Sequence, residues 1–164
     1  MRLTPDIEEI KRVLAYDPAT GIVRWRRPYG GRYCGQIAGA QCKRGYISIN
    51  FRGVSLQAHR IAWALQTGNW PAGEIDHIDH DPSNNRWSNL RDVSRSVNHQ
   101  NRIRARANSR TGLLGARYCP RSKNFFSEIK VGGKYVYLGT YRTAQEAHAA
   151  YVDAKRKHHV GCTL

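Results

Sequence analysis

The sequence predicts an α+β protein that is made of two small folded regions. Of the 164 residues, 40% are hydrophobic, which is enough for packed cores in a chain of this length. The apolar pattern alternates along the chain between the two-residue period of strands and the period of about 3.6 residues that marks helices. Residues 102–112 are basic and have no apolar period, which is typical of a linker. We therefore expect a first region at 1–101 and a second region at 113–160.

The first region is expected to begin with a short amphipathic helix. Thr4 and Pro5 are typical of an N-cap and a first helical position. Apolar residues then recur at helical spacing as far as about Tyr16, namely Ile7, Ile10, Val13 and Leu14. Residues 17–21, DPATG, favour a turn, and residues 22–25, IVRW, favour a strand.

The middle of the first region is expected to contain a loop, a β-hairpin and a helix. Residues 26–45 are rich in glycine and arginine, and we expect a loop with at most one short strand. Residues 47–56 alternate between apolar and polar side chains about an Arg52-Gly53 turn, which predicts a hairpin. Residues 58–68 change to the helical period and end in a glycine, which predicts a helix.

The second region is expected to be a three-stranded antiparallel sheet packed on one helix. Strands are predicted at about 113–118, 125–131 and 134–141, with Gly132-Gly133 as a two-residue hairpin turn. Thr143 and Glu146 predict a capping box at the start of the helix. The helix then carries a narrow packing face made of Ala147, Ala150, Tyr151 and Ala154.

The charge of the chain favours a polyanionic partner. The formal net charge is +15 and the pI is about 10.2. No acidic residue occurs between Asp92 and Glu128, a stretch that is otherwise rich in basic residues: Arg95, Arg102, Arg104, Arg106, Arg110, Arg117, Arg121 and Lys123. A single-sign stripe of this length repels itself unless phosphates neutralise it, so nucleic acid is the expected partner.

The composition also predicts where the protein is located and whether its cysteines form disulfides. No apolar run approaches the roughly 18 residues of a membrane span, and the first residues form no secretory segment. We expect a soluble cytoplasmic protein that is a monomer with no obligate protein partner. The four cysteines are dispersed and are expected to be free thiols. A zinc site from Cys34, Cys42 and two other ligands is the alternative.

Residues 74–101 gather acidic, imidazole and amide side chains in an otherwise basic chain. The set comprises Glu74, Asp76, His77, Asp79, His80, Asp81, Asn84, Asn85, Asn89, Asp92, Asn98, His99 and Asn101. The pattern predicts a strand, a loop, a second strand and a short helix. So short a segment cannot be held together by apolar burial alone. We therefore expect its polar groups to serve chemistry, a metal or the bracing of the loop.

Two resemblances follow from these residues. Residues 74–101 look like an HNH endonuclease motif of the homing and phage nucleases, in the subgroup with asparagine at the third position: Asp76-His77, Asn89 and Asn98. The flanking AHRIAW and NHQN also match that subgroup. The stretch from GARYCPRSKNFF to QEAHAAY resembles the apetala-type, ethylene-response-factor DNA-binding domain. Together the resemblances cover roughly residues 45 to 160 and imply a phage-encoded nuclease with a strand-strand-helix metal finger.

The resemblance implies a role for each motif residue. The catalytic residues are expected to be His77, as the general base, and Asn89, which braces the loop and the backbone of the histidine. Asp76 and Asn98 are expected to hold one divalent cation. Two hard oxygens suit Mg²⁺ or Mn²⁺ better than Zn²⁺. Structural support of the site is expected from Asn85 and His59. The sequence departs from the pattern at His80, where the family usually has glycine.

Double-stranded DNA is the expected substrate, and contacts are expected from both regions. Arg60 and Arg86 are candidates for phosphate contacts near the motif, and the linker adds Arg102, Arg104 and Arg106. The groove-facing candidates of the second region are Arg117, Arg121, Phe125, Lys130, Lys134 and Tyr137. Glu128 is a candidate acceptor from cytosine. Phe126 and Val136 are expected on the opposite face, packed against the helix.

Three readings of the function remain open from the sequence. The first is a DNA endonuclease that works by a single-metal, general-base mechanism and makes nicks or double-strand cuts. The second is a non-catalytic DNA-binding regulator that keeps the finger as a scaffold. The third is a nuclease that acts on RNA.

Overall fold

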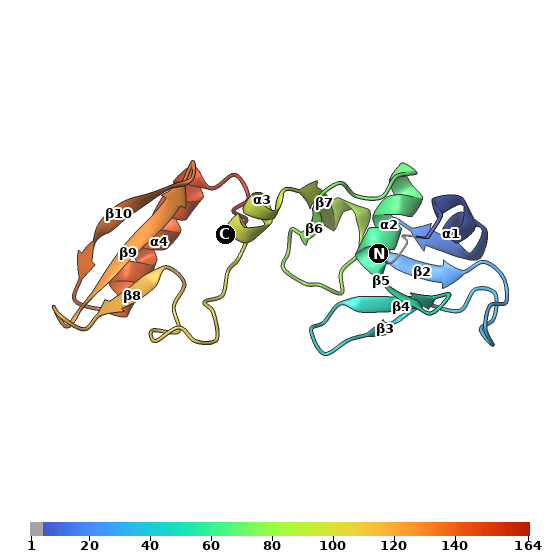
Figure 1. Ribbon diagram of the computed structural model, residues 1–164, viewed down its shortest axis with the longest axis horizontal. Coiled ribbons are helices and arrows are strands. Elements are labelled where there is room, and N and C mark those ends of the chain that lie inside the picture. Colours follow the sequence, from blue (N-terminus) through green and yellow to red (C-terminus); the bar gives the residue numbers. More distant parts are fainter. Residues whose placement is uncertain (1–4) are drawn as a thin grey trace. The chain divides into compact units, whose positions relative to one another are not determined.

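The computed structural model describes residues 5–164 and divides them into two compact units (Figure 1). The first unit extends to Arg95 and the second comprises Ser96–Leu164. Each unit mixes helices with small antiparallel sheets, so the α+β prediction is confirmed. Residues 102–112 contain no helix or strand. Among residues 5–164, no helix has the length and apolar character that a membrane span requires.

The first helix is shorter than predicted. Helix α1 spans Ile7–Val13, and the side chain of Asp6 caps it by accepting a hydrogen bond from the backbone N–H of Glu8. Thr4, the predicted cap, lies outside the described residues. The predicted extension to Tyr16 is wrong, because the chain after Val13 becomes a strand that pairs with the strand at 22–25.

A two-stranded hairpin follows α1. Strand β1 spans Leu14–Asp17 and pairs with β2, Ile22–Trp25, with Leu14 opposite Trp25. Its turn has the Asp17–Gly21 sequence, and Gly21 takes a φ of 76°, a left-handed conformation that favours glycine. The predicted turn and the predicted second strand are therefore confirmed.

The next elements match the predicted loop, hairpin and helix. The loop contains the two-residue strand β3, Ala40–Gln41. Strands β4, Ile47–Phe51, and β5, Val54–Gln57, form the hairpin, and β4 lies between the other two strands. Helix α2 spans Ala58–Thr67 and ends at Gly68, whose φ is 79°.

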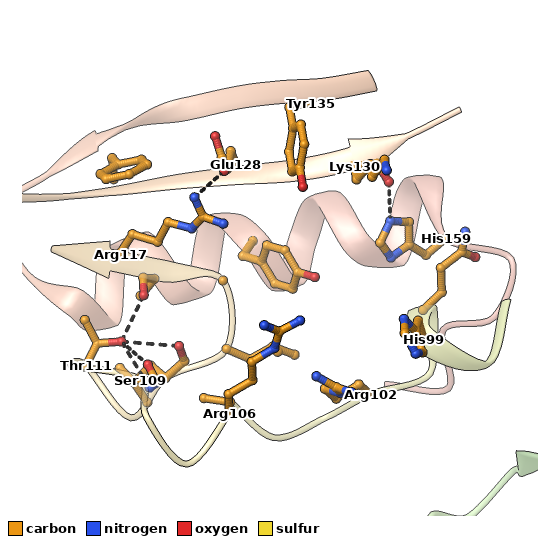
Figure 2. Close-up of a pocket in the computed structure, with 18 of the residues that line it drawn as sticks. His99, Arg102, Arg106, Ser109, Thr111, Arg117, Glu128, Lys130, Tyr135 and His159 are labelled. Atoms are coloured by element: carbon orange, nitrogen blue, oxygen red, sulfur yellow. Dashed lines mark hydrogen bonds and ion pairs between the residues drawn. The ribbon is translucent and has the colours of Figure 1, made fainter. Parts of the chain in front are cut away.

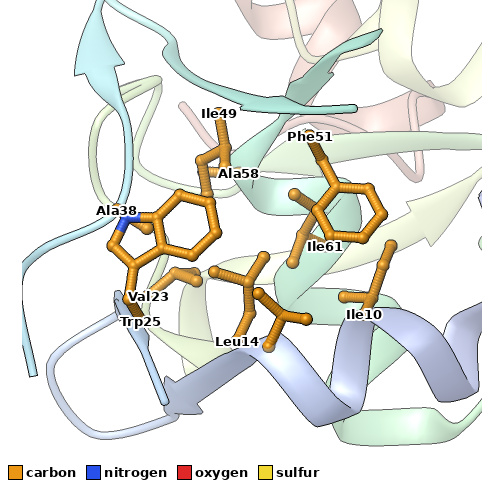
Figure 3. Packing of buried hydrophobic residues seen from close by; sticks show 10 residues of the cluster. Ile10, Leu14, Val23, Trp25, Ala38, Ile49, Phe51, Ala58 and Ile61 are labelled. Atoms are coloured by element: carbon orange, nitrogen blue, oxygen red, sulfur yellow. The ribbon is translucent and has the colours of Figure 1, made fainter. Parts of the chain in front are cut away.

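One hydrophobic core holds these elements together (Figure 3). It contains residues from α1, both hairpins, α2 and the loop before β3: Ile10, Val13, Leu14, Val23, Trp25, Ala38, Ile49, Phe51, Ala58 and Ile61. The ring of Tyr29 stacks between those of Trp25 and Phe51, at centroid distances of 5.0 Å and 5.5 Å. Burial of each large side chain is worth about 1.5–3 kcal/mol, so this core is the rigid base for the more polar segment that follows.

The polar segment forms the predicted strand, loop, strand and helix. Strand β6, Glu74–His77, pairs with β7, Leu90–Val93, and the short 3₁₀ helix η1, Trp87–Asn89, leads into β7. Helix α3 spans Arg95–Gln100. The two strands contribute only Ile75 and Leu90 to a small apolar cluster. Polar contacts must therefore hold the loop between β6 and η1 in place.

The second unit has the predicted sheet and helix. Strands β8, Ala116–Cys119, β9, Asn124–Val131, and β10, Lys134–Tyr141, form an antiparallel sheet with β9 in the centre. Helix α4, Ala144–His158, packs on one face of the sheet (Figure 1). The capping box of Thr143 and Glu146 is present in full.

The predicted linker is fastened to α4 in the second unit. The buried Lys155 donates a hydrogen bond of 2.5 Å from Nζ to the backbone carbonyl of Arg102, and burial lowers the pKa of this lysine. Nδ1 of His148 lies 2.6 Å from the carbonyl of Leu114. A Cβ on Gly115 would lie 2.0 Å from the ring of Tyr151, so only glycine permits this approach. These contacts fix both ends of residues 102–115.

Candidate active site and nucleic-acid interface

His77 lies at the end of β6 in a buried setting made by three other residues. Only 6% of His77 is exposed. The ring of His59 stands edge-on to it at 5.2 Å, and the ring of Tyr46 lies at 5.9 Å. Nε2 of His77 lies 3.1 Å from Oδ1 of Asn85, whose own Nδ2 donates to the carbonyl of Ser83.

These contacts define the tautomer of His77. Because Nδ2 of Asn85 is directed at a carbonyl, it is the acceptor Oδ1 that faces the imidazole. Nε2 of His77 must therefore carry the proton and donate it to Asn85. In a neutral imidazole the other nitrogen, Nδ1, is then the basic one.

His59 is a neutral neighbour of His77. It is the second residue of α2, and 8% of it is exposed. Burial, followed by the nearby His77 and Arg60, lowers the pKa of His59 to about 3. Within the described residues, its Nδ1 has no hydrogen-bond partner. His59 therefore acts in the fold as an uncharged ring that packs against His77.

Asp76 is paired with an arginine that the sequence analysis did not single out. Asp76 is 6% exposed, and its Oδ2 accepts a hydrogen bond from Nε of Arg91 at 2.8 Å. Nη2 of Arg91 forms an ion pair with the same oxygen at 2.7 Å. The two residues lie directly opposite each other in the β6–β7 pair. The antiparallel pairing of EIDH with LRDV is the signal that would have predicted this contact.

Asn89 braces the loop that follows His77. Its Nδ2 donates to Oδ1 of Asp79 at 2.9 Å and to the carbonyl of Asn84 at 2.8 Å, and its Oδ1 accepts from the N–H of Asp79. Burial tends to raise the pKa of Asp79, but hydrogen bonds from Asp81, Asn84 and Asn89 outweigh it and lower the pKa. The carboxylate of Asp79 is therefore a structural acceptor inside the loop.

His80 takes the backbone conformation that the glycine of the pattern would favour. Its φ is 66°, and its N–H donates to the carbonyl of His77 at 3.1 Å. A non-glycine residue in this region costs roughly 1 kcal/mol or more. The tight turn after His77 therefore forms although His80 is a residue type that disfavours a positive φ.

The two predicted phosphate-binding arginines near the motif have partners inside the first unit. Arg60 donates from Nη1 to the carbonyl of Gly73 at 3.2 Å and from Nη2 to that of Pro71 at 3.5 Å. The side chain of Arg86 donates from Nε to the carbonyl of Ala19 at 3.2 Å. Arg60 thus secures the chain that enters β6, whereas Arg86 is exposed and ties the loop to the first hairpin.

The donors expected to bind a metal suit a hard cation. No group of three or more His, Cys, Asp or Glu residues that could hold a metal occurs among residues 5–164. The expected pair contains only one such residue, Asp76, together with an amide oxygen from Asn98 on α3. A carboxylate has about four acceptor positions, so the contact of Arg91 with Oδ2 does not exhaust those of Asp76. The cysteines are all free, and Cys34 and Cys42 are exposed.

The comparison with protein families matches this part of the chain. Residues 56–100 match the family model of HNH endonucleases. This segment is therefore similar to the HNH endonucleases. The matched range begins in β5 and ends with α3, so it includes Asp76, His77 and Asn89. The chemistry to be explained is therefore that of a nuclease.

The chain was also compared with solved structures and with curated proteins. A solved structure described as "DNA binding and cleavage by the HNH homing endonuclease I-HmuI" is similar to this chain. The identity is 21% and the TM-score is 0.45, over 96% of this chain and 93% of the other. No curated protein matches the chain.

The second unit of the nuclease contains a hollow of about 1000 Å³ with basic walls (Figure 2). Residues 102–117 form one wall, and the outer face of β9 and β10 forms another. The basic residues that line the hollow are Arg102, Arg106, Arg110, Arg117 and Lys130. Arg117, at the end of the first wall, forms an ion pair with Glu128 of the sheet at 2.6 Å. Within residues 5–164, no ion pair is found for Arg102, Arg106 or Arg110.

The two phenylalanines of β9 have exchanged the faces predicted for them. Phe125 shares a face with Ser127 and Ile129, both buried under α4, whereas Phe126 shares the outer face with Glu128. The prediction that Phe125 faces outward with Lys130 is wrong, because residues five positions apart in a regular strand point to opposite faces. The irregularity in this sheet lies in β10, between Tyr137 and Gly139.

The remaining candidates lie largely as predicted on the outer face. Tyr137 is opposite Glu128 in the sheet and is 62% exposed, and Tyr135 is opposite Lys130 and is 65% exposed. Val136 is on the side of α4, as predicted, but it stays 46% exposed because it lies two positions after the hairpin turn. The prediction that Lys134 faces outward with Tyr137 is wrong, because Lys134 is opposite Val131 and shares the side of α4 with Val136. Two other predicted DNA contacts are exposed, namely Arg104 and Arg121.

Proposed function

We propose that the protein is a metal-dependent DNA endonuclease in which His77 is the general base. The observation that supports this most strongly is the contact between Nε2 of His77 and Oδ1 of Asn85. It supports a proton on Nε2, which would make Nδ1 the basic nitrogen. This arrangement is the one a water-activating histidine needs.

The reaction begins with a proton transfer to His77. Nδ1 accepts a proton from a water molecule as the oxygen of that water attacks the phosphorus. The resulting imidazolium keeps its Nε2–H bond to Asn85, so its position does not change as charge develops. The buried rings of His59 and Tyr46 hold the imidazole from the side. Removal of a general base typically costs about 10²–10⁴-fold in rate.

Asp76 and Asn98 are the residues that would hold the divalent cation. When bound, such a cation relieves charge on the phosphoryl oxygens and stabilises the leaving 3′ oxygen. Arg91 keeps the Asp76 side chain in one orientation, which lowers the conformational cost of ligation. Mg²⁺ or Mn²⁺ is expected, because the donors are a carboxylate and an amide oxygen.

The second unit is proposed to bind double-stranded DNA. The outer face of its sheet exposes arginine, lysine and tyrosine side chains, and B-DNA admits a small sheet into its major groove. The deep, narrow major groove of RNA does not admit one, which favours DNA over RNA. The arginines of residues 102–110, on the other wall of the hollow, are suited to the phosphate backbone.

The resemblance to phage nucleases supports three further parts of the proposal. The protein would be encoded by a phage, would act in the cytoplasm of the bacterial host, and would work as a monomer. With one active centre per chain, single-strand nicks are expected before double-strand cuts.

Incubation of supercoiled plasmid with the protein tests this function. In the presence of Mg²⁺ or Mn²⁺, open-circular DNA should accumulate first, and a chelator should stop its formation. Plasmid that is bound yet stays supercoiled in every metal tested would contradict the proposal. Gel-shift measurements on the same samples separate loss of cutting from loss of binding.

A further inference from the structure

We propose that the β1–β2 hairpin, which lies outside the matched family range, positions the general base of the nuclease through Tyr16 and Gly21. The inference rests on the proposed role of His77. The hairpin contacts the loop that carries Asn85, and Asn85 holds the imidazole. Tyr16 and Gly21 are therefore positioning residues, and they touch neither the substrate nor the reacting atoms.

The hydroxyl of Tyr16 is the first contact. It donates to the backbone carbonyl of Asn85 at 2.7 Å, across 69 positions of sequence. Burial, followed by the charge of Asp17, raises the pKa of Tyr16 to about 12. The hydroxyl therefore stays protonated and remains a donor over the whole physiological pH range.

Two further hydrogen bonds connect the turn of the hairpin to the same loop. The N–H of Trp87 donates to the carbonyl of Pro18 at 3.0 Å. Nε of Arg86 donates to the carbonyl of Ala19 at 3.2 Å. Three consecutive residues of the loop, from Asn85 to Trp87, are thus bonded to the hairpin.

Gly21 sets how closely the two segments approach. A Cβ at this position would lie 2.5 Å from the backbone N of Arg86 and 2.5 Å from the backbone C of Asn85. Distances this short are not tolerated, and the obstacle is backbone, which cannot swing away as a side chain could. Any larger residue at position 21 must therefore displace the loop.

The hairpin is suited to this role because it is anchored in the core. Leu14, Val23 and Trp25 of its two strands are all less than 4% exposed. Asn85 is itself only 2% exposed, so it is held between a rigid hairpin and the imidazole. The active loop is otherwise braced mainly by its own side chains, such as Asn89. The hairpin connects this loop to the rigid hydrophobic core.

A matched pair of glycine variants tests the inference. Gly21→Ala and Gly31→Ala both place a Cβ at positive φ, of 76° and 79°, but a Cβ on Gly31 meets nothing within 4 Å. Both variants have the same backbone strain from a positive φ. Only in Gly21→Ala does the new Cβ clash with the backbone of the loop that carries Asn85. We expect Gly21→Ala to lower kcat for plasmid nicking by roughly ten- to a hundredfold, with KM changed by less than about threefold. Gly31→Ala should keep the wild-type kcat. Equal kcat values for the two variants would overturn the inference.

A second pair removes a hydroxyl without adding bulk. Tyr16→Phe loses the bond to Asn85, and Tyr29→Phe loses an equivalent bond, in which its hydroxyl accepts from the N–H of Arg52. Tyr16→Phe should lower kcat by about three- to tenfold relative to Tyr29→Phe when both are folded to the same extent. If the two variants lower kcat equally, Tyr16 has only a structural role.

The nitrogen NMR spectrum of the His77 ring provides a test that does not depend on cutting. In the wild-type protein the ring should show the Nε2–H tautomer, and Gly31→Ala should leave that signal unchanged. Gly21→Ala should shift it or mix the tautomers. An unchanged signal in Gly21→Ala would contradict the positioning role even if the protein does not cut DNA. Conversely, a shifted signal in a protein that cuts no DNA would contradict the proposed function, while it would still show that the hairpin positions the His77 ring.

Discussion

The chemistry proposed for His77 depends, at the scale of single residues, on which nitrogen of its ring carries the proton. The sequence predicted His77 as the base and Asn85 as its support, because both fit the motif. It did not predict the contact of Asn85 Oδ1 with Nε2, since a hydrogen bond between side chains depends on the loop conformation. Arg91 was missed for a related reason, because its role follows from strand register and not from the motif.

The buried imidazole of His59 predicts an acid-sensitive fold. Its pKa in the folded protein is about 3, below the ordinary value of 6.5. Below about pH 6.5 the unfolded chain therefore binds a proton here that the folded chain does not, so acid favours unfolding. The free energy of unfolding should fall by roughly 2 kcal/mol from this residue between pH 7 and pH 5. Urea denaturation at the two pH values measures it.

A variant without the titrating ring provides the control for His59. His59→Phe keeps an aromatic ring against His77 but binds no proton. Its free energy of unfolding should decrease less between pH 7 and pH 5 than that of the wild type, whatever its absolute stability. Parallel pH profiles for the two proteins would show that His59 is not the cause.

The backbone of His80 predicts a stabilising substitution. At a φ of 66°, glycine avoids the strain that histidine bears, so His80→Gly should raise the free energy of unfolding by about 1 kcal/mol. The same change in the last turn of α3, His99→Gly, should not raise it, because glycine is a poorer helix former than histidine. Chemical denaturation compares the two. A destabilised His80→Gly protein would mean that the contacts of the imidazole outweigh the strain.

At the scale of elements, periodicity and caps predicted most of the fold. Helix α2, the β4–β5 hairpin and α4 begin and end close to the predicted residues, because each is bounded by a glycine turn or a capping box. Helix α1 was overestimated because Leu14 fits both the helical period and the strand that follows it. The local pattern could not distinguish a helix from a strand at Leu14, since the strand that pairs with this segment, Ile22–Trp25, lies further along the chain.

The side chains on the outer face of the sheet in the second unit were predicted incorrectly for β9. The family-derived contacts placed Phe125 and Lys130 on one face, although alternation in β9 excludes this. The register instead groups Phe126 and Glu128 with Tyr137. Strict alternation from the buried Ile129 would have predicted the correct face.

The basic wall of the hollow in the second unit predicts a salt-dependent DNA affinity. With about 6–10 phosphate contacts, affinity should fall by roughly 10³–10⁵ between 50 and 200 mM salt. Replacing three arginines of the wall, Arg102, Arg106 and Arg110, by alanine should reduce the slope of log K against log salt by roughly 3. Fluorescence anisotropy with duplex DNA measures these slopes.

The control for the predicted salt dependence removes three positive charges from α4 and from the residues just before it. Arg142, Arg156 and Lys157 are exposed and do not line the hollow. Their replacement by alanine should change the slope by much less. Equal slopes for the two triple variants would mean that net charge, and not the hollow, governs binding.

At the scale of the whole molecule, the sequence predicted two folded regions, whereas the first compact unit ends at Arg95 and the second unit includes residues 96–112. The support of the active loop was not predicted. Composition and the unpatterned stretch at 102–112 indicated two folded regions. The hydrogen bonds between the first hairpin and the loop at 85–87 join residues 67 to 69 positions apart, and neither segment carries a pattern that signals the other. The HNH-like motif is local in sequence, but the contacts that hold its loop come from a distant part of the chain.

Plasmid cleavage by a His77→Ala protein tests the central claim most directly. The wild type, His77→Ala and His158→Ala, a change at an exposed residue of α4, are compared in Mg²⁺ and Mn²⁺ at equal DNA occupancy. His77→Ala should bind DNA as the wild type does but cut it at least about 10²-fold more slowly, whereas His158→Ala should cut at the wild-type rate. Cleavage by His77→Ala at the wild-type rate would contradict the assignment of His77 as the general base.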